Sequence, residues 1–112
     1  MAKRILVMTD RMGTGDDELG RLLMRNFLYS LARAETPPAA VLLSNGGVRL
    51  ACEGSDSLDD LRLLVDNGVA VRACGTCLDV LHLKEALAVG EVGTMSDLVA
   101  AVTGEDAIVT IA

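Results

Sequence analysis

Apolar residues along this chain follow two patterns, short unbroken runs and longer stretches that repeat every three or four positions. The runs are typical of buried strands, and the wider repeat is typical of helices with one apolar face. The runs predict strands over residues 5–8, 39–43, 69–73 and 107–111, with a very short one within 88–93. The repeats predict helices over residues 16–31, 57–66, 78–87 and 95–102, and a helical turn over 48–52. We expect Ser57, Thr76 and Ser96 to cap the later helices.

The alternation of strands with helices predicts an α/β fold whose parallel sheet is covered on both faces, because right-handed crossovers set successive strands parallel. At 112 residues the chain has the length of one domain, with no room for a linker. Phe27 and Tyr29 are the only aromatic residues, although 51% of the chain is hydrophobic. We therefore expect a single domain over residues 1–112 with an aliphatic core.

The charge and the cysteine content indicate the cellular compartment of the protein and the classes of partner that it does not bind. The formal net charge is −6 and the basic residues are scattered, which argues against binding to the phosphates of nucleic acid. The N-terminal apolar run is far shorter than the roughly 20 residues that span a membrane. Three cysteines, an odd number, fit reduced thiols better than a disulfide framework. We expect a cytoplasmic protein that binds neither nucleic acid nor membrane.

The most informative motif is Cys74-Gly75-Thr76-Cys77, where strand-like spacing changes to helix-like spacing. Ligands collect at the carboxyl edge of a parallel sheet, because rigid strands hold the loops there. With Thr76 as the cap, Cys77 would lie in the first helical turn, where unpaired amides and the helix dipole favour a thiolate. Cys77 is therefore the candidate nucleophile, with Cys74 as its partner.

These cysteines also allow other interpretations. A Cys-x-x-Cys pair beside a strand–helix junction is the spacing of dithiol oxidoreductases, although the only prolines precede a strand and supply no cis-proline loop. Cys52, Cys74, Cys77 and His82 add up to a Cys3His zinc set, but a second closely spaced ligand pair is missing. A pair of structural cysteines is the third interpretation, and their position at a sheet edge favours function over it. We expect no metal and no other cofactor.

Two glycine-containing loops follow the first two predicted strands. Gly13-Thr14-Gly15 lacks the G-x-G-x-x-G pattern and the P-loop lysine, and the three acids after it would repel an anion. A tight turn is therefore favoured here. Asn45-Gly46-Gly47 also follows a strand, so its backbone amides are expected to face the same cleft as Gly13 to Gly15. Taken alone, Cys52 is expected to be a small buried apolar residue.

Three blocks of the sequence together resemble a known family. They are Thr9 to Gly20 (TDRMGTGDDELG), Asn45 to Ser55 (NGGVRLACEGS) and Cys74 to Asp79 (CGTCLD). In this order they are similar to the DsrE/DsrF-like sulfur-relay family, and within it to the DsrE-like domain of the YedF-type, sulfurtransferase-like selenium-metabolism proteins. The resemblance covers essentially the whole chain. YedF-type proteins commonly carry a TusA-like domain before this one, whereas this sequence starts at the DsrE-like strand.

The resemblance implies a three-layer α/β/α fold of the DsrE-like, flavodoxin-like topology class with about five parallel strands, and frequently a small homo-oligomer. It implies a persulfide-type sulfurtransferase or carrier that works at Cys77 or Cys74, with Cys52 as a further resolving thiol. Its partners would be sulfur donor and acceptor proteins, among them a TusA-like protein. The alternatives are a non-catalytic ligand-binding or protein-binding module and the dithiol oxidoreductase. We expect the substrate cleft to be lined by Gly13, Thr14, Gly15, Asn45, Gly46, Gly47, Gly75 and Thr76.

Overall fold

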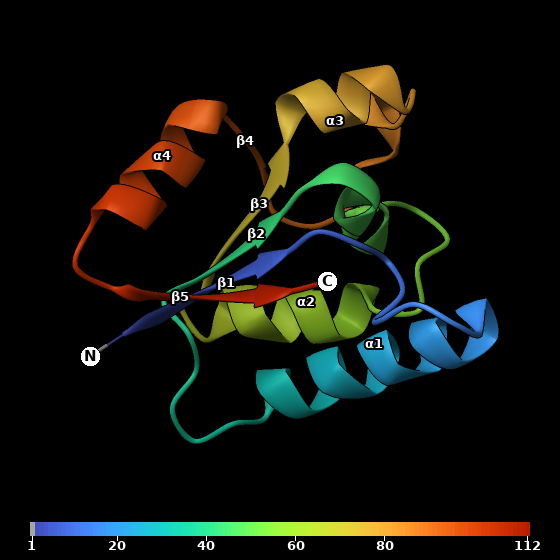
Figure 1. The fold of residues 1–112 in the computed structure, drawn as a ribbon, viewed down its shortest axis with the longest axis horizontal. Helices are drawn as coiled ribbons and strands as arrows, with labels where there is room; N and C mark the ends of the chain where they lie inside the picture. The colour runs from blue at the N-terminus through green and yellow to red at the C-terminus, as the bar shows by residue number, and fades with distance from the viewer. Residues whose placement is uncertain (1) are drawn as a thin grey trace.

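The computed structural model describes residues 2–112, which form a five-stranded sheet surrounded by helices (Figure 1). Every neighbouring pair of strands is parallel, and the order across the sheet is β4-β3-β2-β1-β5. The predicted α/β fold with a parallel sheet of about five strands is confirmed. The elements are β1 (Lys3–Val7), α1 (Asp17–Ala32), β2 (Ala40–Leu43), the 3-10 helix η1 (Asn45–Ala51), α2 (Leu58–Asp66), β3 (Ala70–Cys74), α3 (Gly75–Val80), the 3-10 helix η2 (Lys84–Ala86), β4 (Glu91–Gly93), α4 (Met95–Thr103) and β5 (Ala107–Ile111).

The strand order follows from the direction of the crossovers. The chain moves one strand at a time from β1 to β4, and the last crossover then returns to place β5 beside β1. Because the direction reverses, a right-handed connection puts α4 on the opposite face from α1 and α2. The order differs from the 2-1-3-4-5 order of flavodoxin. The flavodoxin-like expectation therefore holds for the layered architecture and not for the order of the strands.

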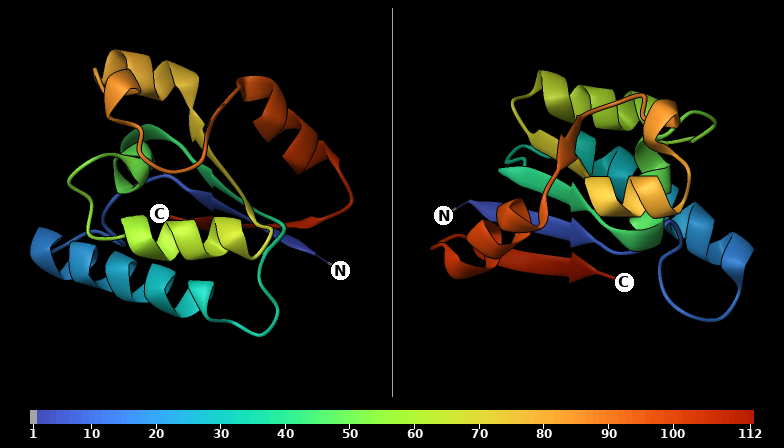
Figure 2. Two further views of the ribbon diagram at one scale, coloured as in Figure 1. Left: turned by 180° about the vertical axis from the view of Figure 1, so that it is seen from behind. Right: turned by 90° about the horizontal axis from the view of Figure 1, so that it is seen from above.

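The two faces of the sheet are covered unequally (Figure 2). α1 and α2 lie together over the main aliphatic core, which includes Val7, Met24, Leu28, Val41 and Leu64. α4 alone covers the other face, where it contributes Ala101 to a small second cluster with Ala40 and Leu42. Since apolar burial drives folding, the layer of α1 and α2 supplies most of the stabilisation of the sheet.

Most predicted elements are confirmed, with ends that shift by a few residues. The largest difference concerns residues 78–87, which were predicted as one helix. α3 ends at Val80, and η2 follows a turn in which His82 has a left-handed backbone (φ 57°). The very short strand predicted within residues 88–93 is β4. Among residues 2–112, no helix is both long enough and apolar enough to cross a membrane.

The residue at the N-cap position differs from the predicted one in two of three helices. Ser57 does hold the N-cap position of α2, but its side chain makes no capping hydrogen bond, so the predicted side-chain cap is absent there as well. α4 is capped by Thr94 and not by Ser96: Thr94 Oγ1 accepts from the Asp97 amide, and the Asp97 carboxylate accepts from the Thr94 amide. α3 is capped by Cys74 and not by Thr76. In both wrong cases the strand passes into the helix without a loop, so the cap lies at the strand end.

Candidate functional site

Two thiols meet at the carboxyl edge of the sheet, where β3 joins α3. Cys74 is the last residue of β3 and also the N-cap of α3. Its Sγ accepts a hydrogen bond from the Cys77 amide at an N–S distance of 3.4 Å. Both side chains are half-buried, and both thiols are free. The first turn of α3 therefore holds Cys74 and Cys77 together as a pair that reagents can reach.

A second segment reaches this thiol pair from the neighbouring strand. η1 begins just after β2, and the backbone amide of Asn45 donates to Cys77 Sγ at 3.1 Å. β2 and β3 are adjacent, so their carboxyl ends bring the two segments together. A backbone N–H that points at sulfur favours the anionic form, whether thiolate or persulfide, over the neutral thiol. Of the residues expected to line the cleft, Asn45 is thus placed directly against Cys77.

Backbone geometry accounts for the residue types at the start of η1. Asn45 has φ of 51°, in the left-handed region that asparagine tolerates better than most residues. Gly47 is buried and packs so closely on the carbonyl group of Val7 that a β-carbon would collide with its oxygen. The close contact with β1 and the left-handed residue together fix the direction of the Asn45 amide.

Burial works against ionisation of the Cys77 thiol. Desolvation, followed by the hydrogen bond with Cys74, raises the pKa of Cys77, and the Asn45 amide lowers it by a smaller amount. The expectation that the helix start would make Cys77 an acidic thiol is therefore wrong. The cause is that desolvation and the neighbouring Cys74 thiol together outweigh the backbone amides that lower the pKa of Cys77.

This shift predicts the pH dependence of Cys77 alkylation. In a Cys74→Ser variant, which removes the Cys74 thiol but leaves desolvation, the largest cause of the shift, we expect the iodoacetamide rate at Cys77 to rise with pH. Its midpoint should lie above about 8.5, the ordinary pKa of a cysteine. The denatured variant supplies the unshifted control, and a midpoint below that control would contradict the effect of burial. Because the folded state holds this proton more tightly, the stability that it contributes is full below the ordinary pKa and is lost as pH rises through the raised one.

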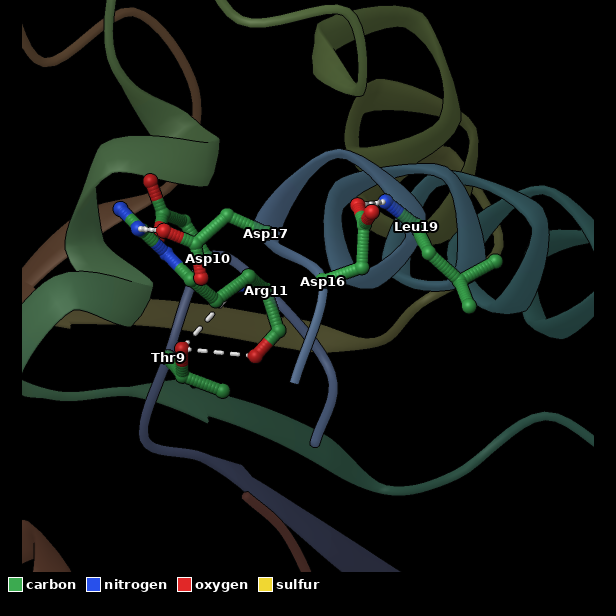
Figure 3. A network of polar contacts seen from close by, with 6 residues as sticks. All are labelled: Thr9, Asp10, Arg11, Asp16, Asp17 and Leu19. Carbon is green, nitrogen blue, oxygen red and sulfur yellow. Dashed lines mark hydrogen bonds and ion pairs between the residues drawn. The ribbon is translucent and has the colours of Figure 1, made fainter. Parts of the chain in front are cut away.

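The loop between β1 and α1 is held by its own hydrogen bonds (Figure 3). Thr9 Oγ1 accepts from the Arg11 amide at 3.0 Å and donates to the Arg11 carbonyl at 2.8 Å. The Arg11 guanidinium contacts Asp10 at 3.1 Å and Asp17 at 2.9 Å. Asp16 accepts from the Leu19 amide at 2.9 Å and so caps α1. The acids after the glycines therefore stabilise the loop and the helix start, as the tight-turn interpretation predicts.

Gly13, Thr14 and Gly15 are exposed on this loop, on the side of the last strand. The Gly13 amide donates to the Ala112 carbonyl at 3.0 Å, next to the end of β5. β5 flanks β1 on the side away from β2 and β3. The amide of Gly13 is thus directed to the C-terminus and not to the thiols, and Asp10 is the part of this loop that approaches Gly46.

Cys52 is buried, unlike the half-buried Cys74 and Cys77. It is buried just after η1, and its Sγ donates to the Val48 carbonyl at 3.2 Å. Desolvation raises the pKa of the Cys52 thiol. Its backbone pairs with Leu87 in an isolated bridge. Cys52 is therefore buried, as expected from its residue type, and a resolving role would require its thiol to leave the Val48 carbonyl.

The remaining candidates have simpler surroundings. Gly75 packs against Val92 of β4, since a β-carbon there would lie 3.0 Å from a Val92 methyl group. Thr76 and His82 are exposed. No group of three histidine, cysteine or acidic side chains within residues 2–112 is arranged to hold a metal ion.

The sequence patterns did not single out two charged residues at this edge. A β-carbon on Gly46 would lie 3.6 Å from Arg49 Nη1 and 3.8 Å from both the amide and Oδ1 of Asp10. Asp10 lies in the block Thr9 to Gly20 and Arg49 in the block Asn45 to Ser55, both of which resemble the known family. A single charged residue, however, produces no periodic pattern that would single it out. Only their position after the ends of β1 and β2 could have drawn attention to them.

Comparisons with known proteins show the fold of this chain. No protein-family model matches it, and neither does any curated protein. The ychN protein from E. coli matches with a TM-score of 0.73 and 19% identity, over 99% of this chain and 100% of that one. The protein of unknown function MTH1491 from Methanobacterium thermoautotrophicum matches with a TM-score of 0.68 and 22% identity, over 98% and 99%. The chain therefore shares the fold of the ychN protein over nearly all of its residues.

Proposed function

We propose that the protein carries sulfur, or its chemical analogue selenium, as a persulfide on Cys77 and passes it to the thiol of a partner protein. The observation that supports this most is the hydrogen bond of 3.1 Å from the Asn45 amide to Cys77 Sγ. It places a fixed donor where the negative charge of a thiolate or persulfide resides. The DsrE/DsrF-like fold is consistent with a sulfur relay.

The transfer needs only thiol chemistry. The Cys77 thiolate attacks the outer sulfur of a donor persulfide, so a sulfur–sulfur bond forms on Cys77 while the donor's bond breaks. The donor leaves as a thiolate and takes up a proton. An acceptor thiolate then attacks the outer sulfur of the Cys77 persulfide and releases the Cys77 thiolate. One sulfur atom has moved between two thiols, and no net oxidation or reduction has occurred.

Cys74 and Cys52 have different parts in this proposal. Cys74 lies next to Cys77, so its thiolate could attack the inner sulfur of the persulfide, form the Cys74–Cys77 disulfide and release hydrosulfide. Cys52 is buried, and its thiol donates a hydrogen bond to the Val48 carbonyl. It can act as a resolving thiol only after that hydrogen bond breaks. The raised pKa of Cys77 keeps most of it protonated at neutral pH. A donor protein that brings a basic group beside Cys77 would raise the thiolate fraction, and the net charge of −6 suits such a partner.

The test is intact-mass analysis after incubation with glutathione persulfide. We expect the unmodified chain to gain one sulfur atom that dithiothreitol removes, and the Cys77→Ser variant to gain none. Cys52→Ser is the matched control, because it makes the same substitution at a buried cysteine outside the Cys74–Cys77 pair. The Cys52→Ser protein should still gain sulfur. If Cys77→Ser gains sulfur as fully as the unmodified chain does, the nucleophile is another cysteine. If none of the chains gains sulfur, the proposed carrier role is wrong.

The contact between the two thiols also favours a second candidate, the dithiol oxidoreductase. The Cys74 thiol beside Cys77 contributes to the raised pKa of Cys77, and Cys74 Sγ accepts from the Cys77 amide. The two candidates differ in what they require of Cys74. A carrier should still gain and transfer sulfur as Cys74→Ser, because one thiol is enough. An oxidoreductase should lose all disulfide-reducing activity in that variant, because its catalytic disulfide cannot form.

A further inference from the structure

A cavity lies between α1, η1 and the segment after η1, and neither Cys74 nor Cys77 lines it. Its volume is about 340 Å³, within the range of pockets that hold small molecules. α1 contributes Arg21 and Arg25, and η1 contributes Arg49. We call this cavity the arginine pocket. Its other lining residues are Asp10, Leu50, Cys52, Glu53, Gly54, Ser55, Asp56, Ser57 and Leu83.

The three arginines of this pocket differ from the other arginines of the chain in having no ion pair. Within residues 2–112, no acidic group lies within ion-pair distance of Arg21, Arg25 or Arg49. Every other arginine has such a partner, and these are Arg4, Arg11, Arg33, Arg62 and Arg72. In a chain with a net charge of −6, acids are abundant enough to pair all of them. The unpaired guanidinium groups are therefore concentrated in one cavity.

In this pocket the unpaired guanidinium groups outnumber the unpaired carboxylates. Asp10 is paired with Arg11 at 3.1 Å, and Arg11 also contacts Asp17. Glu53 and Asp56 are the lining acids outside any ion pair, so two unpaired carboxylates stand beside three unpaired guanidinium groups. Arg49 also influences the interior of the pocket, since its charge lowers the pKa of Cys52 while Glu53 raises it. The electrostatics thus suit a ligand with one anionic group.

The walls of the pocket limit the rest of the ligand. Leu50 and Leu83 offer apolar surface, and the backbone amide of Ser57 is already bonded to Ser55 Oγ at 3.0 Å. Glu53 and Asp56 can accept hydrogen bonds from hydroxyl or ammonium groups of a ligand. Guanidinium groups bind planar or tetrahedral oxyanions with paired hydrogen bonds, which is why arginine is preferred at such sites.

We propose that the arginine pocket binds a small molecule through one oxyanion group, a carboxylate, phosphate or sulfur oxyanion, held by Arg49 together with Arg21 and Arg25. The uncharged part of the ligand lies against Leu50 and Leu83, and its hydrogen-bond donors face the carboxylates of Glu53 and Asp56. This binding does not rest on the proposed persulfide chemistry, because neither Cys74 nor Cys77 lines the pocket.

The test is isothermal titration of the full chain carrying Cys74→Ser and Cys77→Ser, so that thiol reactions contribute nothing. Sodium phosphate, thiosulfate and acetate are titrated separately against sodium chloride at equal ionic strength, and their ranking identifies the class of oxyanion. We expect at least one of them to bind saturably with a Kd of about 1 mM or tighter. If the heat of binding for each of the three anions still rises without saturation at about 50 mM, the proposal is overturned.

Charge-matched variants locate the site. Arg49→Gln and Arg25→Gln should each weaken the binding about tenfold, because each removes a charge-assisted hydrogen bond. Arg62→Gln removes the same charge from a surface pair on α2 and should change the affinity less than twofold. All three side chains are exposed, so these variants should fold, and their unfolding midpoints check this. Equal weakening by all three variants would show an effect of net charge alone and would overturn the pocket as the site.

Discussion

Gly47→Ala should destabilise the protein by about 3 kcal/mol, at the upper end of the usual cost of overpacking. A β-carbon at this position would collide with the carbonyl oxygen of Val7 and lie 3.1 Å from its carbonyl carbon. Val7 is fully buried in β1, between β2 and β5, and its oxygen also accepts from the Ser44 amide. The Val7 backbone cannot move without disturbing the sheet, and a shift of η1 would break the hydrogen bond from the Gly47 amide to the Ser44 carbonyl, so the strain cannot be relieved cheaply.

Chemical denaturation with urea measures this loss as a shift of the unfolding midpoint at constant slope. Gly46→Ala is the matched control, because its β-carbon would meet nothing closer than 3.6 Å. That variant should stay within about 0.5 kcal/mol of the unmodified chain. A Gly47→Ala protein as stable as the Gly46→Ala protein would mean that η1 does not pack on β1 as described. The Gly47→Ala substitution should also expose the Asn45 amide to water and slow any persulfide loading of Cys77.

Leu78→Ala should cost about 3 kcal/mol, the middle of the range for a buried leucine. Leu78 is fully buried, is the residue after Cys77, and is the one buried residue of α3. α3 has 6 residues, too few to be stable by itself, so the packing of Leu78 holds the helix and the thiol pair in place. We therefore expect this variant to lose the raised pKa of Cys77 as well as stability.

Val80→Ala in the same helix serves as the control for Leu78→Ala. Val80 is 69% exposed, so its truncation should change the free energy of unfolding by less than about 0.5 kcal/mol. Urea denaturation gives the stability of both variants, and the pH dependence of Cys77 alkylation gives the thiol pKa. If the two variants lose similar stability, Leu78 is not the anchor of α3.

Part of the candidate site could be predicted from the sequence. A Cys-x-x-Cys at the end of an apolar run is a local signal, and it placed Cys74 and Cys77 at the carboxyl edge of the sheet. The acids after Gly15 are likewise a local signal, and their role at the helix start was predicted correctly. The ionisation of Cys77 was predicted wrongly, because desolvation depends on what covers a side chain in three dimensions.

The arginine pocket shows what no local pattern contains. Arg21 and Arg25 are four positions apart on α1 and so share a helix face, but no spacing in the sequence relates them to Arg49 on η1. Only the packing of α1 beside the segment after β2 brings them to one cavity. Likewise, the contact between Asn45 and Cys77 spans 32 positions and exists because β2 and β3 are neighbours.

The sequence by itself determined most of the elements, the parallel sheet and the position of the thiols, because hydrophobic spacing and turn residues act over a few neighbouring positions. It did not determine the caps of α3 and α4, because a cap depends on where a strand stops pairing with its neighbour. The tertiary structure alone decided which amide faces Cys77, how far its thiol is desolvated, and which arginines stay unpaired. These properties depend on distances between segments that are remote in the chain, and such distances are fixed only when the sheet order and the helix packing are in place.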